Sequence, residues 1–284
     1  ILAAGAPEFR FANTPDPERR LRVGFLCQDI QRDSPIARFV AAPLLRLDPK
    51  GFEVLGYCTQ PTREQMSPHL LQAVAPPGWL DVSAMDDPAL VDRLRADRLD
   101  ILIETAGNTA GHRQAALAHR AAPVQVTCIG DPRTTGNPAV DFRLVDAITD
   151  PPGSDGLCTE RLVRLPGCFL CYEPHPDAPL PRAPFDPARG PVTFGSFNVH
   201  DKTGPEVIDL WARILRQVDR SRLVIKSLGL RSRDLREHLS AMFRERGVDP
   251  LRVELAWEVP AMRDHLLKYL RIDIALDTFP YNGT

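Results

Sequence analysis

The 284-residue sequence lacks any apolar run near the roughly 18 residues that a helix needs to cross a bilayer. We therefore expect no membrane partner. It also lacks an excess of charge of one sign, because 35 Lys and Arg residues are balanced by 37 Asp and Glu residues, leaving a net charge of -2. Proteins that coat nucleic acid are usually strongly basic, so we expect no nucleic-acid partner. An anionic ligand must then be met by local cations or helix ends.

The familiar short motifs of catalysis and cofactor binding are absent as well. The sequence has no P-loop, no HExxH, no Ser-His-Asp set, and no GxGxxG with a downstream acidic residue, which argues against a Rossmann-type oxidoreductase. Cys168 and Cys171 form a CxxC, but no second cysteine pair or histidine pair stands at zinc-ligand spacing. We therefore expect no metal site, and we interpret the six cysteines as reduced thiols of a cytoplasmic protein.

What the sequence does contain is a regular alternation of strand and helix patterns. Between residues 21 and 145, apolar runs typical of buried strands alternate with segments whose apolar residues recur at helical spacing. This alternation is typical of a parallel, doubly wound α/β sheet. The expected strands are 21–27, 52–58, 100–104, 124–129 and 142–145, and the expected helices are 35–47, 88–96 and 111–119.

A cluster of seven prolines interrupts this alternation at residues 173–191. Because so many prolines can form neither a helix nor a central strand, we expect an interdomain linker there. A second α/β series follows it, so the sequence predicts two Rossmann-like domains, at 21–172 and 192–284, with a further linker at 1–20. In the second series the expected strands are 192–197, 223–226, 253–255 and 272–276, and the expected helices are 205–218, 232–246 and 262–270.

The two ends of the sequence are typical of part of a longer chain. It begins Ile-Leu-Ala-Ala-Gly without Met, and its first 20 residues lack the continuous apolar core of a signal peptide. It ends at Thr284, directly after an apolar strand pattern, whereas domains seldom end at the tip of a central strand. We therefore expect truncation at both ends and an incomplete second domain.

Small and polar residues follow the expected strands, at the edge where open α/β sheets bind their ligands. Lys202 comes four residues after Asn198 and just before a helix, so its ammonium can lie beside a phosphate held at the helix N-terminus. Taken alone, Lys202 fits a solvated surface lysine better, and His265 fits a surface or core histidine. The small and polar residues that follow the expected strands lie at 28–29, 105–111 and 130–136 in the first half. In the second half they begin at Asn198, Ser227, Ala256 and Asp277.

Five stretches, spread in order over nearly the whole chain, are specific when they are taken together. They are LRVGFL (21–26), APVQVTCIGDPRTTG (122–136), TERLVRLPGCFLCYEP (159–174), VTFGSFNVHDKTGPEVIDLWARIL (192–215) and YLRIDIALDTFPYNGT (269–284). With them, the sequence resembles the catalytic region of O-linked N-acetylglucosamine transferases, particularly the SPINDLY-like bacterial members. The resemblance implies a two-Rossmann glycosyltransferase of the GT-B type, usually preceded by tetratricopeptide repeats. It also implies transfer of N-acetylglucosamine from UDP-GlcNAc to Ser or Thr of a protein or peptide acceptor.

The resemblance assigns donor-binding roles to residues of the second domain. Asn198 and Lys202 belong to the family's F-N-x-x-x-K motif, whose lysine neutralises the donor diphosphate and so stabilises the leaving group. His265 matches a histidine near the nucleotide. Asn282 and Thr284 belong to the start of a loop that holds the phosphates. No cofactor besides the nucleotide-sugar donor is implied, because the lysine and helix ends do the work of a Mg²⁺ ion.

The resemblance also assigns residues of the first domain. Gly130, Pro132 and Thr134 match a glycine–proline turn that borders the donor and the acceptor. Thr109 lies in the glycine-rich loop 107–111, and we include it among the donor-binding candidates. Asp29 follows the first strand near the right turn and is a candidate catalytic residue, as the general base.

Several positions depart from the family pattern. Ser34 stands where the family has a histidine beside the sugar, Asp131 replaces an aromatic residue, and Arg133 replaces a glycine. The glycine-rich loop has Asn108 where histidine is usual. Two alternatives therefore stay open beside GlcNAc transfer. One is transfer of fucose from GDP-fucose, as in SPINDLY-type relatives, and the other is a degenerate member that binds without turnover.

Overall fold

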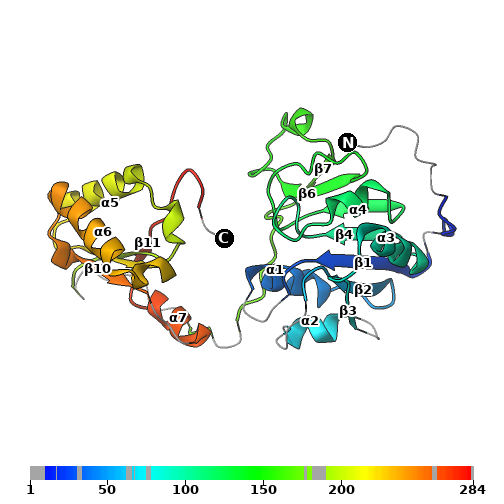
Figure 1. Cartoon of the computed structure of the whole chain (residues 1–284), viewed down its shortest axis with the longest axis horizontal. Helices are drawn as coiled ribbons and strands as arrows, with labels where there is room; N and C mark the ends of the chain where they lie inside the picture. The colour runs from blue at the N-terminus through cyan, green and yellow to red at the C-terminus, as the bar shows by residue number, and fades with distance from the viewer. Residues whose placement is uncertain are drawn as a thin grey trace. The chain divides into compact units, whose positions relative to one another are not determined.

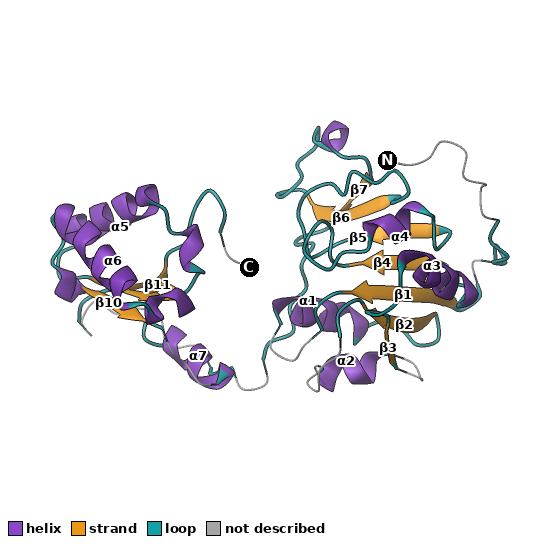
Figure 2. Ribbon diagram, viewed as in Figure 1, coloured by secondary structure: helices purple, strands orange, loops and turns teal. Residues whose placement is uncertain are grey.

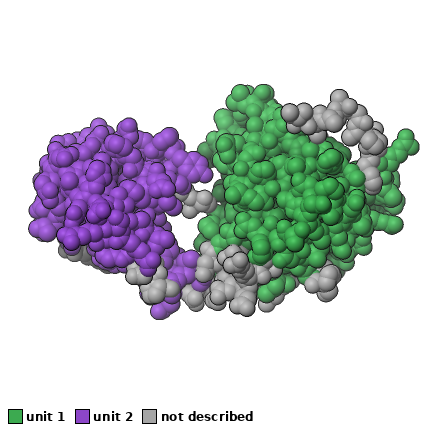
Figure 3. Space-filling view, viewed as in Figure 1, with its two compact units in different colours: residues 1–174 green, residues 175–284 purple. Residues whose placement is uncertain are grey.

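Two compact units make up the chain, residues 1–174 and residues 175–284 (Figure 3). Each is an α/β structure built around its own parallel sheet (Figure 2). In the part of the chain that the structure describes, no helix has both the length and the apolar character to cross a membrane. This computed structural model describes residues 10–16, 18–30, 34–61, 66, 68–74, 78–175, 178–180, 190–257 and 261–282.

The sheet of unit 1 has seven parallel strands in the order β3-β2-β1-β4-β5-β6-β7 (Figure 1). β1 pairs with β2 on one side and with β4 on the other, so the sheet grows in one direction before β4 and in the opposite direction from β4 onward. This reversal is the switch point at which doubly wound sheets bind ligands. The strands are β1 (Leu21–Cys27), β2 (Phe52–Cys58), β3 (Trp79–Asp81), β4 (Ile101–Glu104), β5 (Val124–Thr127), β6 (Phe142–Asp146) and β7 (Arg161–Leu165).

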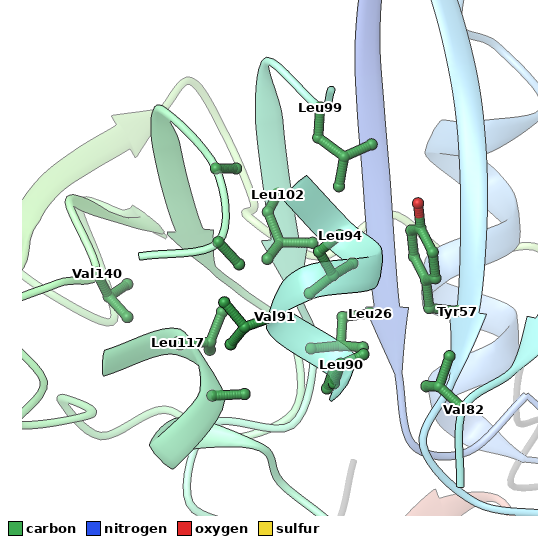
Figure 4. Packing of buried hydrophobic residues seen from close by; sticks show 13 residues of the cluster. Leu26, Tyr57, Val82, Leu90, Val91, Leu94, Leu99, Leu102, Leu117 and Val140 are labelled. Atoms are coloured by element: carbon green, nitrogen blue, oxygen red, sulfur yellow. The ribbon is translucent and has the colours of Figure 1, made fainter. Parts of the chain in front are cut away.

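Helices cover both faces of this sheet. They are α1 (Pro35–Leu44), α2 (Pro68–Ala73), α3 (Asp87–Ala96) and α4 (Gln114–Ala118). Leu26 and Leu102 pack with the buried leucines of α3 and α4 in one apolar cluster (Figure 4). Phe25 and Cys27, which alternate with Leu26 along β1, pack with α1 in a second cluster. The near-continuous apolar pattern of β1 therefore follows from burial on both faces.

Unit 2 repeats the design with four parallel strands in the order β10-β9-β8-β11. Here β8 lies between β9 and β11, so a second switch point lies beside it. Phe194, Leu223 and Ile225 of the sheet pack with Trp211 and Phe243 of the helices in a single cluster. The elements are β8 (Thr193–Ser196), η3 (His200–Lys202), α5 (Pro205–Gln217), β9 (Arg222–Lys226), α6 (Arg233–Glu245), β10 (Val253–Ala256), α7 (Met262–Tyr269) and β11 (Ile274–Ala275).

Local sequence signals explain where the longer helices begin and end. The Asp86 side chain accepts a hydrogen bond from the backbone N–H of Ala89 at the start of α3, and Ser232 caps Leu235 at the start of α6 in the same way. Gly247, with φ of 74°, follows α6 in the left-handed region that favours glycine. These residues fix the helix limits close to those expected from the sequence.

Polar contacts fasten the residues before β1 to the amino-terminal edge of the unit 1 sheet. Asp100, directly before β4, accepts hydrogen bonds from the backbone N–H of Arg22 (2.8 Å) and from the Arg19 guanidinium. The Asn13 amide donates to the carbonyl of Leu99 (3.1 Å). The described part of the segment that we expected to be a linker is therefore anchored at the edge opposite the strand carboxyl ends.

Candidate functional site

The switch point of unit 1 is bridged by a hydrogen bond between side chains. Gln28 follows β1, and its amide donates to the hydroxyl of Thr109 (2.7 Å), in the loop after β4. Thr109 in turn donates to the carbonyl of Ala106 (2.7 Å). The hydroxyl of Thr109 is thus engaged within the protein, while Asp29 comes immediately after Gln28 at the same edge. Asp29 and Thr109, both predicted site residues, therefore lie at the ends of neighbouring strands, β1 and β4.

A buried carboxylate lies beneath the glycine-rich loop. Glu104, the last residue of β4, is 2% exposed and accepts hydrogen bonds from the backbone N–H groups of Ala106 (2.9 Å) and Gly107 (2.9 Å) and from the Thr127 hydroxyl. Burial raises the pKa of Glu104, although these hydrogen bonds oppose the effect. The carboxylate therefore sets the start of the loop, a role that sequence reasoning did not identify.

The glycine–proline turn is packed so tightly that only glycine fits at its centre. A Cβ at Gly130 would overlap the backbone carbonyl of Thr105, and the preceding residue, Ile129, has a φ of 77°. The carbonyl of Pro132 accepts a hydrogen bond from the buried Arg143 guanidinium. Gly130 and Pro132 therefore shape a fixed turn beside the loop after β4.

Thr134 is held at the end of this turn by a buried glutamate. Its hydroxyl donates to Glu160 (2.7 Å), which also accepts from the backbone N–H of Thr135 (2.7 Å). The Asn108 amide donates to the carbonyl of Thr134 (3.0 Å) and so joins the turn to the glycine-rich loop. Thr109, Gly130, Pro132 and Thr134 thus lie on two loops that the structure connects.

Two residues that depart from the family pattern have structural partners here. Ser34 is the N-cap of α1, because its hydroxyl oxygen accepts from the backbone N–H groups of Ile36 (3.1 Å) and Ala37 (3.5 Å). Asp131 is buried and accepts from the Arg133 guanidinium (2.8 Å). Burial raises the pKa of Asp131, but the hydrogen bonds and charge of Arg133 outweigh it, so the net pKa is lowered.

The switch point of unit 2 is also bridged. Asn198 follows β8, and its amide donates to the carboxylate of Asp277 (3.0 Å), which follows β11. These are the two strands on either side of the reversal in strand order. A predicted donor-binding residue therefore lies at the position where an open α/β sheet binds its ligand.

Lys202 is the last residue of η3, four residues after Asn198. Its ammonium donates to the backbone carbonyl of Asn282 (3.0 Å) and lies 4.4 Å from the centre of the Tyr281 ring. The Thr278 hydroxyl donates to the carbonyl of Tyr281 (2.9 Å) and holds that turn in place. Among the described residues, no carboxylate lies within ion-pair distance of Lys202, so its charge is balanced only by a carbonyl dipole and a π face.

His265 forms part of a second group at the same edge of unit 2. Its Nδ1 lies 2.6 Å from the ammonium of Lys226, the last residue of β9. Phe197 and Tyr269 complete the group, with 4.6 Å between their ring centres. Burial lowers the pKa of both members of the pair, and the charge of Lys226 lowers that of His265 further.

The predicted site residues thus form two groups, one at the carboxyl edge of each sheet. Thr284 lies outside the described residues, so its predicted contact is not placed. Sequence reasoning missed Glu104, Lys226 and Tyr281. A charged residue that ends an apolar strand run is the signal that would have identified Glu104 and Lys226. Nowhere in the described ranges are three or more His, Cys, Asp or Glu side chains grouped so that they could hold a metal ion.

Comparison with known proteins decides the family. The model of the family described as glycosyl transferase family 41 matches residues 1–175, which is more than half of the chain. The chain belongs to glycosyl transferase family 41. Membership agrees with the resemblance derived from the five sequence stretches, and the recognition made from the sequence is confirmed.

The chain is similar over nearly its whole length to two relatives that share one name. It is 40% identical over 278 residues to a protein of Arabidopsis thaliana named probable UDP-N-acetylglucosamine--peptide N-acetylglucosaminyltransferase SPINDLY, and 38% identical to the protein of the same name from Petunia hybrida. Each alignment covers 96% of this chain, and they cover 30% and 29% of the two relatives, respectively. The family 41 chain therefore spans less than a third of the length of these plant proteins.

Solved structures confirm the fold. A mutant of the O-GlcNAc transferase of Thermobaculum terrenum is 38% identical, with a TM-score of 0.84 over 98% of this family 41 chain and 52% of that chain. The lipopolysaccharide outer core galactosyltransferase WaaB is 13% identical with a TM-score of 0.56, covering 89% of this chain and 72% of its own, a likeness of fold alone. The α/β class of the GT-B type, predicted from the sequence, is thereby confirmed.

Proposed function

We propose that the chain is the donor-binding and catalytic part of an enzyme that transfers N-acetylglucosamine from UDP-GlcNAc to Ser or Thr hydroxyls of proteins. The observation that carries the proposal is the position of Lys202. Its ammonium has no described carboxylate partner and contacts Asn282, in the segment that follows Asp277 of the Asn198–Asp277 bridge. In this proposal the Lys202 ammonium places a positive charge beside the diphosphate of the donor. Membership of family 41 supports the proposal.

The chemistry follows from the charge that develops on the leaving group. When the bond between the sugar and the diphosphate breaks, negative charge builds up on the phosphate oxygens, and a cation already in place stabilises it more than it stabilises the ground state. We propose that Lys202 supplies this stabilisation without a metal cofactor. Asp29, at the carboxyl end of β1, is our candidate for the base that removes the proton of the acceptor hydroxyl.

Calorimetric titration of the 284-residue chain with UDP, beside GDP, tests the donor assignment. We expect UDP to bind and Lys202→Ala to weaken it about 10-fold or more, because a charge-assisted hydrogen bond is lost. Lys50→Ala, at an exposed turn before β2, is the matched control and should bind UDP like the wild type. Binding of GDP in place of UDP would support GDP-fucose as the donor. Binding of neither nucleotide would contradict a donor site in this chain.

Ser34 favours a second candidate, a family member that binds the nucleotide without turnover. The resemblance implies a histidine beside the sugar at this position, whereas the Ser34 side chain caps α1. Incubation with UDP-GlcNAc and a Ser/Thr-rich peptide, followed by mass spectrometry, separates the candidates. Peptide carrying the added sugar supports transfer, and UDP binding without any product supports the second candidate.

We also propose a cytoplasmic location. Support comes from the cysteines, because all six, including the exposed Cys168 and Cys171, are free thiols, as is usual in a reducing compartment. The proposed partners are the nucleotide-sugar donor and a protein or peptide acceptor.

A further inference from the structure

Lys226 is a buried lysine that forms no ion pair with any residue that the structure describes. The residue is 9% exposed, and none of the described carboxylates lies within ion-pair distance of its ammonium. A buried ammonium loses hydration, so it requires a partner that accepts a hydrogen bond. Its hydrogen-bond partner is His265, across 2.6 Å, and the Phe197 ring lies 5.5 Å away. The function proposed above gives Lys226 no part.

This contact determines which nitrogen of His265 carries the hydrogen. An ammonium group has three donors and no acceptor, so Nδ1 of the imidazole must accept. A neutral imidazole whose Nδ1 accepts carries its hydrogen on Nε2. Burial lowers the pKa of His265, and the positive charge of Lys226 lowers it further, so the neutral form prevails at neutral pH.

Aromatic neighbours hold the imidazole ring in place. Tyr269, one turn along α7, packs edge-on against His265 with 5.5 Å between ring centres, and also against Phe197 at 4.6 Å. All three rings are partly exposed at the carboxyl edge of the unit 2 sheet. Partly exposed aromatic rings are the surfaces on which a nucleotide base stacks. Burial lowers the pKa of Lys226, and the positive charge of Lys268 on α7 lowers it further.

We propose that Lys226 is a positioning residue that holds His265 as the neutral tautomer with hydrogen on Nε2, so that His265 donates to a carbonyl oxygen of the nucleotide base. The proposal rests on the nucleotide-binding function given above. Uracil and guanine, the bases of the two donors considered above, both carry such carbonyl oxygens. A protonated His265 would have no acceptor for the buried Lys226 ammonium and would repel it, so the contact requires the neutral ring.

Two substitutions of Lys226 test this role. Lys226→Met removes the donor with little change in shape, and Lys226→Arg keeps a cationic donor. The first readout is ¹⁵N NMR of the histidine side chains, with His265→Gln to assign the signals. In the wild type and in Lys226→Arg, the His265 signals should be those of a single tautomer with hydrogen on Nε2. In Lys226→Met they should be those of a tautomer mixture.

The second readout is the affinity for UDP as a function of pH, measured by calorimetry. The wild-type profile from pH about 5.5 to 7.5, where an ordinary histidine titrates, is the reference against which each variant is compared. Lys226→Met should weaken UDP binding roughly 2- to 10-fold at pH 7, because the neutral ring then populates both tautomers, and the loss should shrink as the pH falls, because a protonated His265 donates from Nε2 again. Lys226→Arg should restore both the affinity and the pH profile of the wild type.

The outcomes separate this inference from the function on which it rests. If wild type does not bind UDP, or if Lys202→Ala binds it unchanged, the proposed donor site is wrong. If Lys202→Ala weakens UDP binding but Lys226→Met changes neither the His265 tautomer nor the pH profile of binding, the positioning role of Lys226 is overturned. Thermal unfolding of each variant identifies any that fails to fold, and if Lys226→Met fails, the wild-type NMR spectrum decides, because a His265 with hydrogen on Nδ1 overturns the proposal.

Discussion

Ser34 illustrates how one side chain can replace a family residue and still have a definite task. Its hydroxyl oxygen accepts from Ile36 and Ala37 and so satisfies backbone donors that the first turn of α1 leaves unpaired. The sequence indicated only that histidine was missing at this position. The capping role follows from the side-chain contacts, which a pattern of residue types does not contain.

Ser34→Ala should lower the free energy of unfolding by about 1 kcal/mol, the usual cost of losing an N-cap. Ser34→Thr keeps the hydroxyl and should lie closer to the wild type. Urea denaturation followed by far-UV circular dichroism measures the difference. Equal stability of Ser34→Ala and wild type would show that water replaces the cap at no cost.

At the scale of elements, the short turn at Phe279–Asn282 positions the proposed phosphate-binding lysine. Tyr281→Leu removes the π face 4.4 Å from the Lys202 ammonium, while Tyr281→Phe keeps it. An exposed cation–π contact contributes about 0.5–1 kcal/mol, so we expect UDP affinity to fall about 2- to 5-fold in Tyr281→Leu and to stay unchanged in Tyr281→Phe. Calorimetry on the Lys202→Ala background should show no further loss, and an undiminished loss there would mean that Tyr281 acts independently of Lys202.

The turn after β5 depends on Glu160 in its ionised form. Burial raises the pKa of Glu160, but hydrogen bonds from Thr135 and Thr134 outweigh burial and lower the net pKa below its usual value. The folded state therefore binds fewer protons than the unfolded state in acid. The stabilisation is complete above the unfolded pKa, about 4.3, and is lost as the pH falls through the folded pKa.

Glu160→Gln should accordingly lower stability at pH 7 and flatten its decline below pH about 4.5. Urea midpoints at pH 7 and pH 3.5 give the measurement. Glu18→Gln, at an exposed position before β1, is the control and should follow the wild type at both pH values. A Glu160→Gln curve parallel to the wild-type curve would mean that other carboxylates determine the acid sensitivity.

The central strands, which are buried on both faces of the sheet, were predictable from the sequence. The strands at the sheet edges were not. The limits of β1 and β2 were predicted correctly, because both strands are apolar runs between clear breaks. The predictions missed β3, which has only three residues, and β7, a strand at the sheet edge in which Arg161 and Arg164 interrupt the apolar run. α1 ends at Leu44 and not at residue 47, because Leu45 to Leu47 form a turn after Pro43.

The candidate site was predictable in its strand-end positions but not in its contacts. The rule that ligands bind beyond strand carboxyl ends placed Asn198 at a strand end from the sequence alone, and the structure puts that strand end at the switch point of unit 2. The Lys226–His265 contact joins residues 39 positions apart in sequence, and neither residue type predicts the other. Such pairs depend on how α7 packs on the sheet, which periodicity alone does not define.

At the scale of the whole molecule, each unit has apolar clusters of its own. Leu117 belongs to a cluster confined to unit 1, and Trp211 to one confined to unit 2. We expect two unfolding transitions in calorimetry. Leu117→Ala should lower one midpoint, at a cost of about 2–5 kcal/mol, and Trp211→Ala should lower the other. If both variants shift one common transition, the units unfold as a single cooperative structure.

The two ends of the first sheet have different roles, because Asp100 at one end binds Asn13 and Arg19 of the segment before β1. The amino-terminal end of the sheet holds the segment before β1, and the carboxyl-terminal end carries the loops of the candidate site. Sequence drift at the anchoring end should therefore change thermal tolerance and leave donor preference intact. Over evolutionary time, relatives living at different temperatures can diverge there while keeping the same chemistry.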